Sequence, residues 1–336
     1  MKRKIWFVSL IVLIFSSSHG FSETQDDNRK LIGFSQIRTV YNEDKFNFSI
    51  NKVRLILGGD ITSNLLYSFV GEGGDVAPNG SQTFSLLDAY LEYKVSDLIN
   101  IRVGQDWYKF GWEYTQSVPT LPFINFSETI SKLCDTMGRK GYYGYDIGIW
   151  MNGSRNLVSS FLIGYNFSLT NGTGLNSSDD NQWKDLSVRF YSRFFDHYHI
   201  GFSIFRGESS FGDEGLNECL YDIEIRYLRD RFTLGFEYIG EKLEESEDSP
   251  LEYPEVVENG YYVYASYNLI DDLDVLLRYD TNTGIINEQV NDEKIYTIGT
   301  TYWIKDLTNL KANYIRKYYD DLNEDLLLVQ IQMFFK

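Results

Sequence analysis

Basic residues recur in segments of this sequence in which polar and apolar side chains alternate. Each falls on the polar side of its segment, and acidic residues share that side. Guanidinium groups bind phosphate and carboxylate oxygens in a bidentate manner, so a row of arginines along one wall could bind anions. The alternative is that these charges pair across neighbouring strands and hold them in register. The basic positions are Arg54, Lys94, Arg102, Arg189, Arg226 and Arg278, and the acidic ones include Asp88, Glu92, Asp222, Glu224 and Glu237.

A second set of charges lies in residues 106–143, a stretch longer than a surface cap requires. Loops of this length without secondary structure are usually functional. If the stretch folds into a pore, its charges would set a field that sorts solutes by charge. If it packs outward on a neighbouring subunit, the same charges are solvated. They are Lys109, Glu113, Glu128, Lys132, Asp135, Arg139 and Lys140.

The stretch from Ser85 to Glu113 indicates which elements position these residues. Side chains of a strand point to opposite faces in turn, so a period of two predicts a β-hairpin here. The polar face carries Asp88, Tyr90, Glu92, Lys94, Arg102 and Gly104, and the apolar face carries Leu87, Ala89, Leu91, Tyr93, Ile101 and Val103.

Connections between such segments alternate in length along the chain, and we count sixteen candidate strands. Short turns are predicted at 58–64, 95–99, 152–156, 193–198, 229–231, 268–272 and 305–308. Long loops are predicted at 71–83, 106–143, 166–183, 207–219, 241–259 and 280–293, with shorter links at 41–45 and 317–325. This alternation predicts an all-β fold, a transmembrane antiparallel β-barrel with short periplasmic turns and long external loops. A soluble β-sandwich or β-helix would also have many alternating strands.

The apolar faces of these strands carry few charges and end in aromatic residues, as expected of a surface in contact with outer-membrane lipid and lipopolysaccharide. Residues 1–20 combine Lys2, Arg3 and Lys4 with a short apolar run and small residues, which predicts a signal peptide. A polar leader at 21–30 and a barrel domain at 31–336 would follow. The last strand ends at Phe335 and resembles the C-terminal strand that barrel insertion machinery recognises. We therefore expect export to the outer membrane of a Gram-negative-type bacterium.

The formal charge of −17 becomes about −20 once the three basic residues of the signal peptide are removed, which argues against nucleic acid as a partner. The three histidines, His19, His197 and His199, form no pattern typical of a metal site or a catalytic triad. We expect no enzyme activity, no metal and no cofactor. Cys134 and Cys219 could form a disulfide in an oxidising compartment, and the sequence leaves that open.

Three short motifs resemble the phosphate-selective porin O and P family. They are Leu87–Tyr93, Arg102–Gln105 and Phe110–Glu113, with Arg139, Gly141 and the strand Tyr145–Met151 as further matches. The resemblance implies a homotrimer of sixteen-stranded barrels with loops folded into the lumen. It also implies a porin for passive diffusion of small hydrophilic solutes or ions, with an anion preference if the arginines form a ladder. The acidic, lysine-free stretch 207–219 departs from a lysine-lined anion entrance. The other hypothesis is a non-conducting barrel that acts as a surface adhesin or structural protein.

Overall fold

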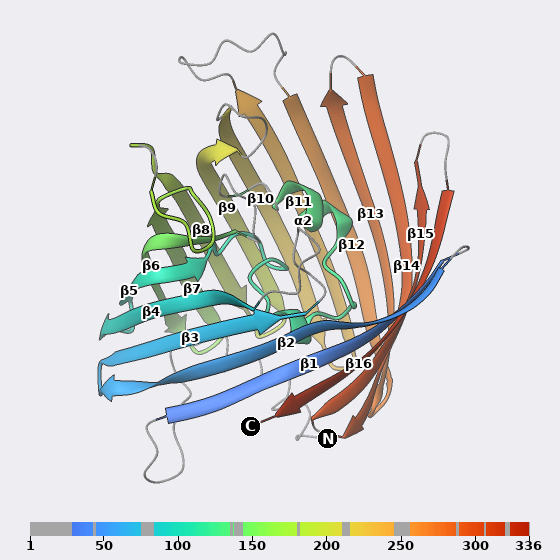
Figure 1. Ribbon diagram of the computed structural model, residues 1–336, viewed down its shortest axis with the longest axis horizontal. Coiled ribbons are helices and arrows are strands. Elements are labelled where there is room, and N and C mark those ends of the chain that lie inside the picture. The colour runs from blue at the N-terminus through green and yellow to red at the C-terminus, as the bar shows by residue number, and fades with distance from the viewer. Residues whose placement is uncertain are drawn as a thin grey trace.

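The computed structural model is a closed antiparallel β-barrel (Figure 1). It describes residues 29–42, 45–74, 84–134, 137, 144–179, 182–209, 216–244, 256–286, 289–305, 307–319 and 323–335. These residues form sixteen strands: β1 (Arg29–Asn42), β2 (Lys45–Thr62), β3 (Leu65–Gly73), β4 (Ser85–Ser96), β5 (Ile99–Trp107), β6 (Tyr145–Val158), β7 (Phe161–Thr170), β8 (Asp185–Phe194), β9 (Tyr198–Ser209), β10 (Leu216–Arg229), β11 (Phe232–Glu244), β12 (Val256–Ile270), β13 (Leu273–Ile286), β14 (Gln289–Lys305), β15 (Thr308–Tyr318) and β16 (Asn323–Phe335).

Each strand pairs with its neighbours in the sequence, and β1 pairs with β16 to close the ring. That last pairing runs from Gly33 opposite Phe335 to Tyr41 opposite Leu327. A closed sheet has no free edge, so its backbone N–H and C=O groups find partners within the wall. The predicted transmembrane barrel of sixteen antiparallel strands is confirmed.

The short turns lie at one end of the barrel, but two predicted connections are wrong. The turn predicted at 152–156 is part of β6, which continues to Val158 and pairs with β7. Its Asn and Gly residues mark close packing rather than a turn, because a Cβ on Gly153 would collide with the backbone of Leu98. The long loop predicted at 280–293 is also wrong. Polar residues 281–284 continue β13, and only residues 287–288 separate β13 from β14.

Side chains alternate between an apolar outer face and a polar inner face, with one correction to the predicted hairpin. Leu91, Ile101 and Val103 are exposed on the outside, as predicted, but Leu87 is buried inside the barrel against Val70. The register between β3 and β4 shifts at this point, where Val70 pairs with Asp88 and Gly71 with Leu86. Leu87 is therefore the extra residue of a β-bulge, which turns its side chain inward.

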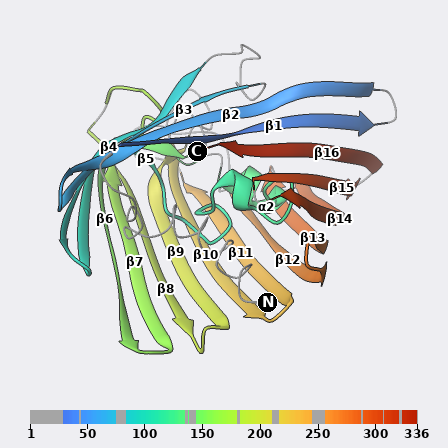
Figure 2. The same cartoon turned by 90° about the horizontal axis from the view of Figure 1, so that it is seen from below.

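Two short helical segments lie in the connection between β5 and β6, residues 108–144, which we call loop three. They are the 3-10 helix η1 (Val118–Thr120) and the helix α2 (Glu128–Leu133). In the view from below, α2 lies within the ring of strands (Figure 2). The described residues contain no helix that is both long and apolar enough to cross a membrane.

Both cysteines are free, so the disulfide left open by the sequence does not form. Cys134 follows α2 and is buried inside the barrel. Cys219 lies on β10 between the buried residues Glu218 and Leu220, which face inward, so its own side chain faces outward. The wall of the barrel separates the two thiols. Burial also raises the pKa of Cys134, which keeps its thiol protonated.

The predicted signal peptide lies outside the described residues, as does most of the predicted leader. The first strand begins at Arg29, so Arg29 and Lys30 belong to the barrel rather than to the leader.

Replacing an outward-facing leucine by arginine tests the assignment of the faces. Leu277 is 57% exposed on the outer face of β13, and Ser266 of β12 lies on the inner face. We expect Leu277→Arg to lower the free energy of unfolding in lipid vesicles by roughly 2–4 kcal/mol, the cost of a cation near the bilayer midplane. The inner-face control, Ser266→Arg, should cost much less. Equal losses in urea titrations of the two variants would contradict the assignment.

Counting reactive thiols tests the state of the cysteines. We expect the unreduced protein, unfolded in denaturant, to take up two equivalents of an alkylating reagent, one for each free cysteine. Mass spectrometry reads the number directly. Uptake of reagent only after reduction would show that a disulfide had formed.

Candidate functional site in the barrel lumen

Loop three leaves the wall after β5 and crosses the lumen to the opposite side of the barrel. Its backbone N–H groups donate to Glu237 of β11 from Trp112, at 3.0 Å, and to Asn313 of β15 from Ile124, at 2.8 Å. The side chain of Gln332 of β16 donates to the carbonyl of Pro119 at 3.1 Å. Loop three therefore folds inward, and the outward packing considered as an alternative is not formed.

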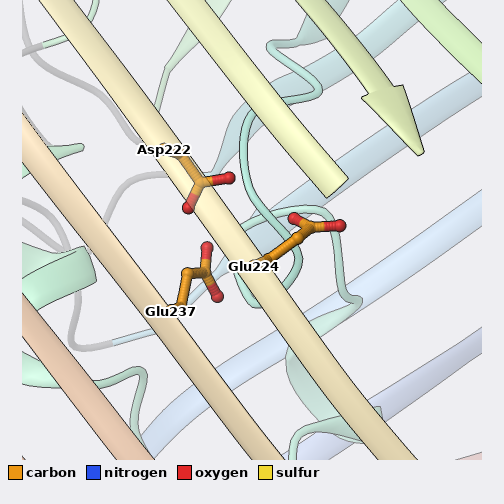
Figure 3. A group of neighbouring side chains, drawn as sticks. All are labelled: Asp222, Glu224 and Glu237. Atoms are coloured by element: carbon orange, nitrogen blue, oxygen red, sulfur yellow. The ribbon is translucent and has the colours of Figure 1, made fainter. Parts of the chain in front are cut away.

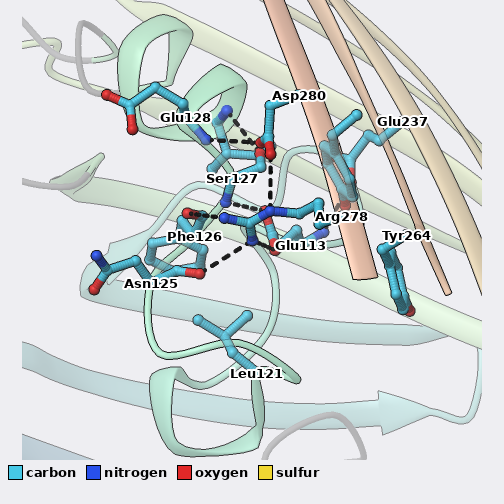
Figure 4. Close-up of polar contacts among 12 residues, drawn as sticks. Glu113, Leu121, Asn125, Phe126, Ser127, Glu128, Glu237, Tyr264, Arg278 and Asp280 are labelled. Carbon is cyan, nitrogen blue, oxygen red and sulfur yellow. Dashed lines mark hydrogen bonds and ion pairs between the residues drawn. The ribbon is translucent and has the colours of Figure 1, made fainter. Parts of the chain in front are cut away.

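The first anchor of loop three is Arg278, on the inner face of β13 (Figure 4). Its guanidinium donates to the carbonyls of Asn125 and Phe126 at 3.2 and 3.1 Å. It also pairs with Asp280 at 3.0 Å and with Glu113 at 3.5 Å. The side chains of Arg278, Asp280 and Glu113 are buried. We call these three side chains and the two loop carbonyls the Arg278 anchor. It ties both halves of loop three to a single strand.

Two loop residues complete the Arg278 anchor. Glu113 accepts a hydrogen bond from the N–H of Ser127 at 2.7 Å, and Ser127 in turn caps the start of α2 by accepting from Ile130. Asp280 accepts from the N–H of Glu128 at 3.0 Å. Burial raises the pKa of Glu113 to about 7, which Arg278 opposes.

The second anchor is Glu237, on the inner face of β11. Its two carboxylate oxygens accept from the N–H groups of Trp112 and Glu113, at 3.0 and 3.1 Å, and from the hydroxyl of Tyr262 at 2.5 Å. Gly111 precedes these donors with a φ of +59°, and a Cβ at that position would collide with the Glu237 carboxylate. Only glycine lets the loop approach the wall so closely.

Aromatic side chains pack between loop three and the wall. Tyr108 packs edge-on against Phe205, with ring centroids 5.0 Å apart, and Trp112 stacks on Tyr264 at 6.0 Å. The buried cluster also contains Phe110, Phe123, Ile130, Leu133, Leu220, Ile239, Tyr262 and Leu276. This cluster excludes water from the part of the lumen that faces β9 to β13.

Predicted charges of loop three pair with the wall rather than facing an open channel. Glu128 accepts from Lys317 at 3.0 Å, and Lys132 pairs with Glu293 at 2.5 Å. Lys109 lies 3.2 Å from Asp106 and 3.5 Å above the ring of Trp107. Asp135, Arg139 and Lys140 lie outside the described residues.

The predicted basic positions of the wall face the lumen, and most are paired with carboxylates. Arg54 binds Glu72 at 2.7 Å. Arg102 binds both Glu92, at 2.5 Å, and Asp106, and it stacks on Tyr90. Arg102 and Glu92 are cross-strand partners, so they fit the alternative in which charges pair across neighbouring strands and hold them in register.

The other basic positions differ in their surroundings. Arg189 binds Glu224 at 2.5 Å, and Lys94 lies 3.4 Å from Asp97 near a short turn. Arg226 stacks 3.4 Å above the ring of Trp112 and donates to the hydroxyl of Tyr264. In the described part of the chain, no carboxylate lies within ion-pair distance of Arg226. The predicted acid Asp88 is buried on the inner wall.

Among the described residues, one cavity of about 40 Å³ lies between loop three and the wall on the side of β2 to β4. Its charged lining consists of Lys52, Arg54 and Glu72, and Lys52 lies 2.9 Å from Glu72. Neither Lys52 nor Glu72 was predicted as a site residue. Lys52 could have been found from the period of two that placed Arg54 on the inner face, whereas Glu72 fell in a stretch predicted to be a loop.

Solved structures with the same fold include several porins. An anion-selective porin from Comamonas acidovorans matches with a TM-score of 0.70 and 13% identity, covering 91% of this chain and 99% of that chain. OmpF of Salmonella typhi, in complex with daunomycin, matches with a TM-score of 0.69 and 14% identity, covering 94% and 100%. The trimer form of OmpT, an outer membrane protein of Vibrio cholerae, matches with a TM-score of 0.63 and 12% identity, covering 91% and 99%. These likenesses establish the fold.

The family follows from the sequence itself. No curated protein sequence matches the chain. Residues 28–335, however, match the family model described as phosphate-selective porin O and P. The match spans almost the whole chain and confirms the resemblance seen in the short motifs. The protein therefore belongs to the phosphate-selective porin O and P family and is an outer-membrane porin.

Proposed function

We propose that small hydrophilic solutes and ions diffuse passively past loop three, on the side of the barrel formed by β2 to β4. The observation that carries this proposal is the asymmetric position of the loop. Both of its anchors, Arg278 and Glu237, lie on the far wall, where an aromatic cluster fills the lumen. The charged cavity lined by Lys52, Arg54 and Glu72 lies on the near side. Loop three would then be the constriction.

We further propose a preference for anions in general rather than for phosphate alone. Two cations, Lys52 and Arg54, line this cavity with one carboxylate, Glu72, which both of them contact. The carboxylates of Asp222, Glu224 and Glu237 are buried beneath loop three. Charges farther than roughly 8 Å from the path of an ion are largely screened at physiological salt, so the cavity lining should outweigh the acidic outer loops.

The assembly and location that we propose follow from the family and from the similar structures. A trimer form occurs among the proteins of the same fold, which supports a homotrimer here. The barrel would lie among lipid and lipopolysaccharide in the outer membrane of a Gram-negative-type bacterium. Residues 1–20 would direct export, and the strand ending at Phe335 would engage the insertion machinery. We infer no catalytic activity, no cofactor and no nucleic-acid partner.

The filling of the lumen favours one other function. Loop three packs into an aromatic cluster on one side of the lumen, so the barrel could be a closed structural protein or adhesin. Conductance separates the two functions, since a closed barrel passes no ions.

Reversal potentials test the ion preference. In a planar bilayer under a potassium chloride gradient, we expect the reversal potential of the wild type to lie toward the equilibrium potential of chloride. Lys52→Gln removes one of the two cations that line the cavity, so its reversal potential should shift toward the equilibrium potential of potassium. Arg206→Gln is the matched control, because Arg206 is exposed on the outer face of β9. It should behave like the wild type. A wild-type reversal potential toward the equilibrium potential of potassium would refute the anion preference but not the channel. The absence of conductance would support the closed barrel.

Single-channel conductance tests the role of loop three. Arg278→Gln removes two hydrogen bonds to the loop backbone and leaves Glu113 and Asp280 without their cation. Breaking a buried ion pair in this way costs about 3–5 kcal/mol. We expect loop three to leave its docked position and the conductance to become larger and noisier.

The control for this substitution is Arg316→Gln, which lies on β15 beside Asp325 and away from loop three. Its conductance should match the wild type. If a folded Arg278→Gln barrel, identified by heat-modifiable migration, conducts like the wild type, then the Arg278 anchor does not set the size of the channel.

A further inference from the structure

Three carboxylates meet on the inner wall where β10 and β11 run side by side (Figure 3). Asp222 and Glu224 come from β10, and Glu237 is the cross-strand partner of Glu224 on β11. One oxygen from each lies within 4.8 Å of the other two. All three side chains are 1% exposed or less, so water does not solvate their charges.

The hydrogen-bond partners of this triad account for only some of its oxygens. Glu237 is satisfied by loop three and Tyr262, as described above. One oxygen of Glu224 is bound by Arg189 and His199, each at 2.5 Å. One oxygen of Asp222 accepts from Ser203 at 3.4 Å. The second oxygens of Asp222 and Glu224, Oδ2 and Oε2, are buried and accept no hydrogen bond.

Unpartnered carboxylate oxygens are costly in a buried setting, because each loses its water without gaining a donor. The charges are unbalanced as well. When ionised, the three carboxylates carry three negative charges, and among the residues that the structure describes Arg189 is the one cation in ion-pair contact with them when His199 is neutral. Two negative charges therefore remain, which equals the charge of one divalent cation.

We propose that Asp222, Glu224 and Glu237 bind a divalent cation of the calcium type. Every donor is an oxygen, as hard cations require, and nitrogen or sulfur ligands are not involved. Calcium suits the site because it accepts irregular geometry and mixes carboxylates with water and neutral oxygens. The Ser203 hydroxyl, next to Asp222, is such an oxygen.

The position of this site connects it to loop three. Glu237 would contribute to the cation and also accepts the N–H groups of Trp112 and Glu113. Gly111 brings the loop backbone against the same carboxylate and donates its own N–H to Ser203 at 2.9 Å. A bound cation would therefore hold the wall in the arrangement to which the loop docks.

Calorimetry tests the site directly. The full-length mature chain, refolded in detergent and freed of metal with a chelator, is titrated with calcium chloride. We expect wild type to bind one calcium that Asp222→Asn binds about tenfold or more weakly, since losing a ligand should cost at least as much as losing an outer hydrogen-bond partner of one. Asp60→Asn, an inner-face aspartate of β2, is the matched control and should bind like the wild type.

A second ligand variant guards against misfolding of the first. Glu224→Gln keeps an acceptor for Arg189 and loses the ligand charge, and heat-modifiable migration identifies the folded barrels. Terbium, which replaces calcium at oxygen sites, adds an optical measurement, because Trp112 and Tyr262 flank the triad and can sensitise its emission. We expect emission that calcium displaces in the wild type and in Asp60→Asn, and that both ligand variants lack.

The proposal fails if the wild type binds no calcium, or if both ligand variants bind calcium and terbium like Asp60→Asn. Either result would indicate that a proton shared between Asp222 and Glu237, rather than a cation, lowers the negative charge of the triad. These outcomes do not depend on conduction, so they can be told apart from a failure of the proposed channel function.

Discussion

The need to pair every backbone polar group inside a bilayer governs this structure. Pairing of β1 with β16 meets that need by closing the sheet, and closure divides the side chains into a lipid face and a luminal face. The lumen that results is wide, polar and rich in charge. The charged side chains of the lumen therefore need partners, and loop three supplies many of them through its backbone N–H and C=O groups and its charged side chains.

Loop three gives the lumen an interior like that of a soluble protein. Aromatic residues of the loop and wall pack into a cluster, and buried ion pairs surround it. Glu237 and Arg278 lie on the same side of the barrel and bind backbone groups of the loop, and Arg278 also pairs with the side chain of Glu113. Such contacts explain why loop three lies against one wall and leaves space beside the other.

Pairing also changes the meaning of the arginines. A row of guanidinium groups suggests an anion track, but Arg54, Arg102, Arg189 and Arg278 all contact carboxylates. Most of their positive charge is therefore neutralised by these carboxylates. On the proposed path, selectivity depends on the charged side chains that line the cavity, Lys52, Arg54 and Glu72, while the acids of β10 and β11 are covered by the loop.

Alternation and connection length are local properties that recur along the chain, so they predict the barrel and its number of strands, and the short motifs predict the family. These patterns misplaced the turn at 152–156 and the face of Leu87, where close packing and a bulge override local preference. The pairs of charges that come together depend on the tertiary fold. Arg278 and Glu113 are 165 residues apart, and the two cysteines lie on opposite sides of the wall. A period of two gives the face of each residue, but its partner across the lumen depends on where the loop docks.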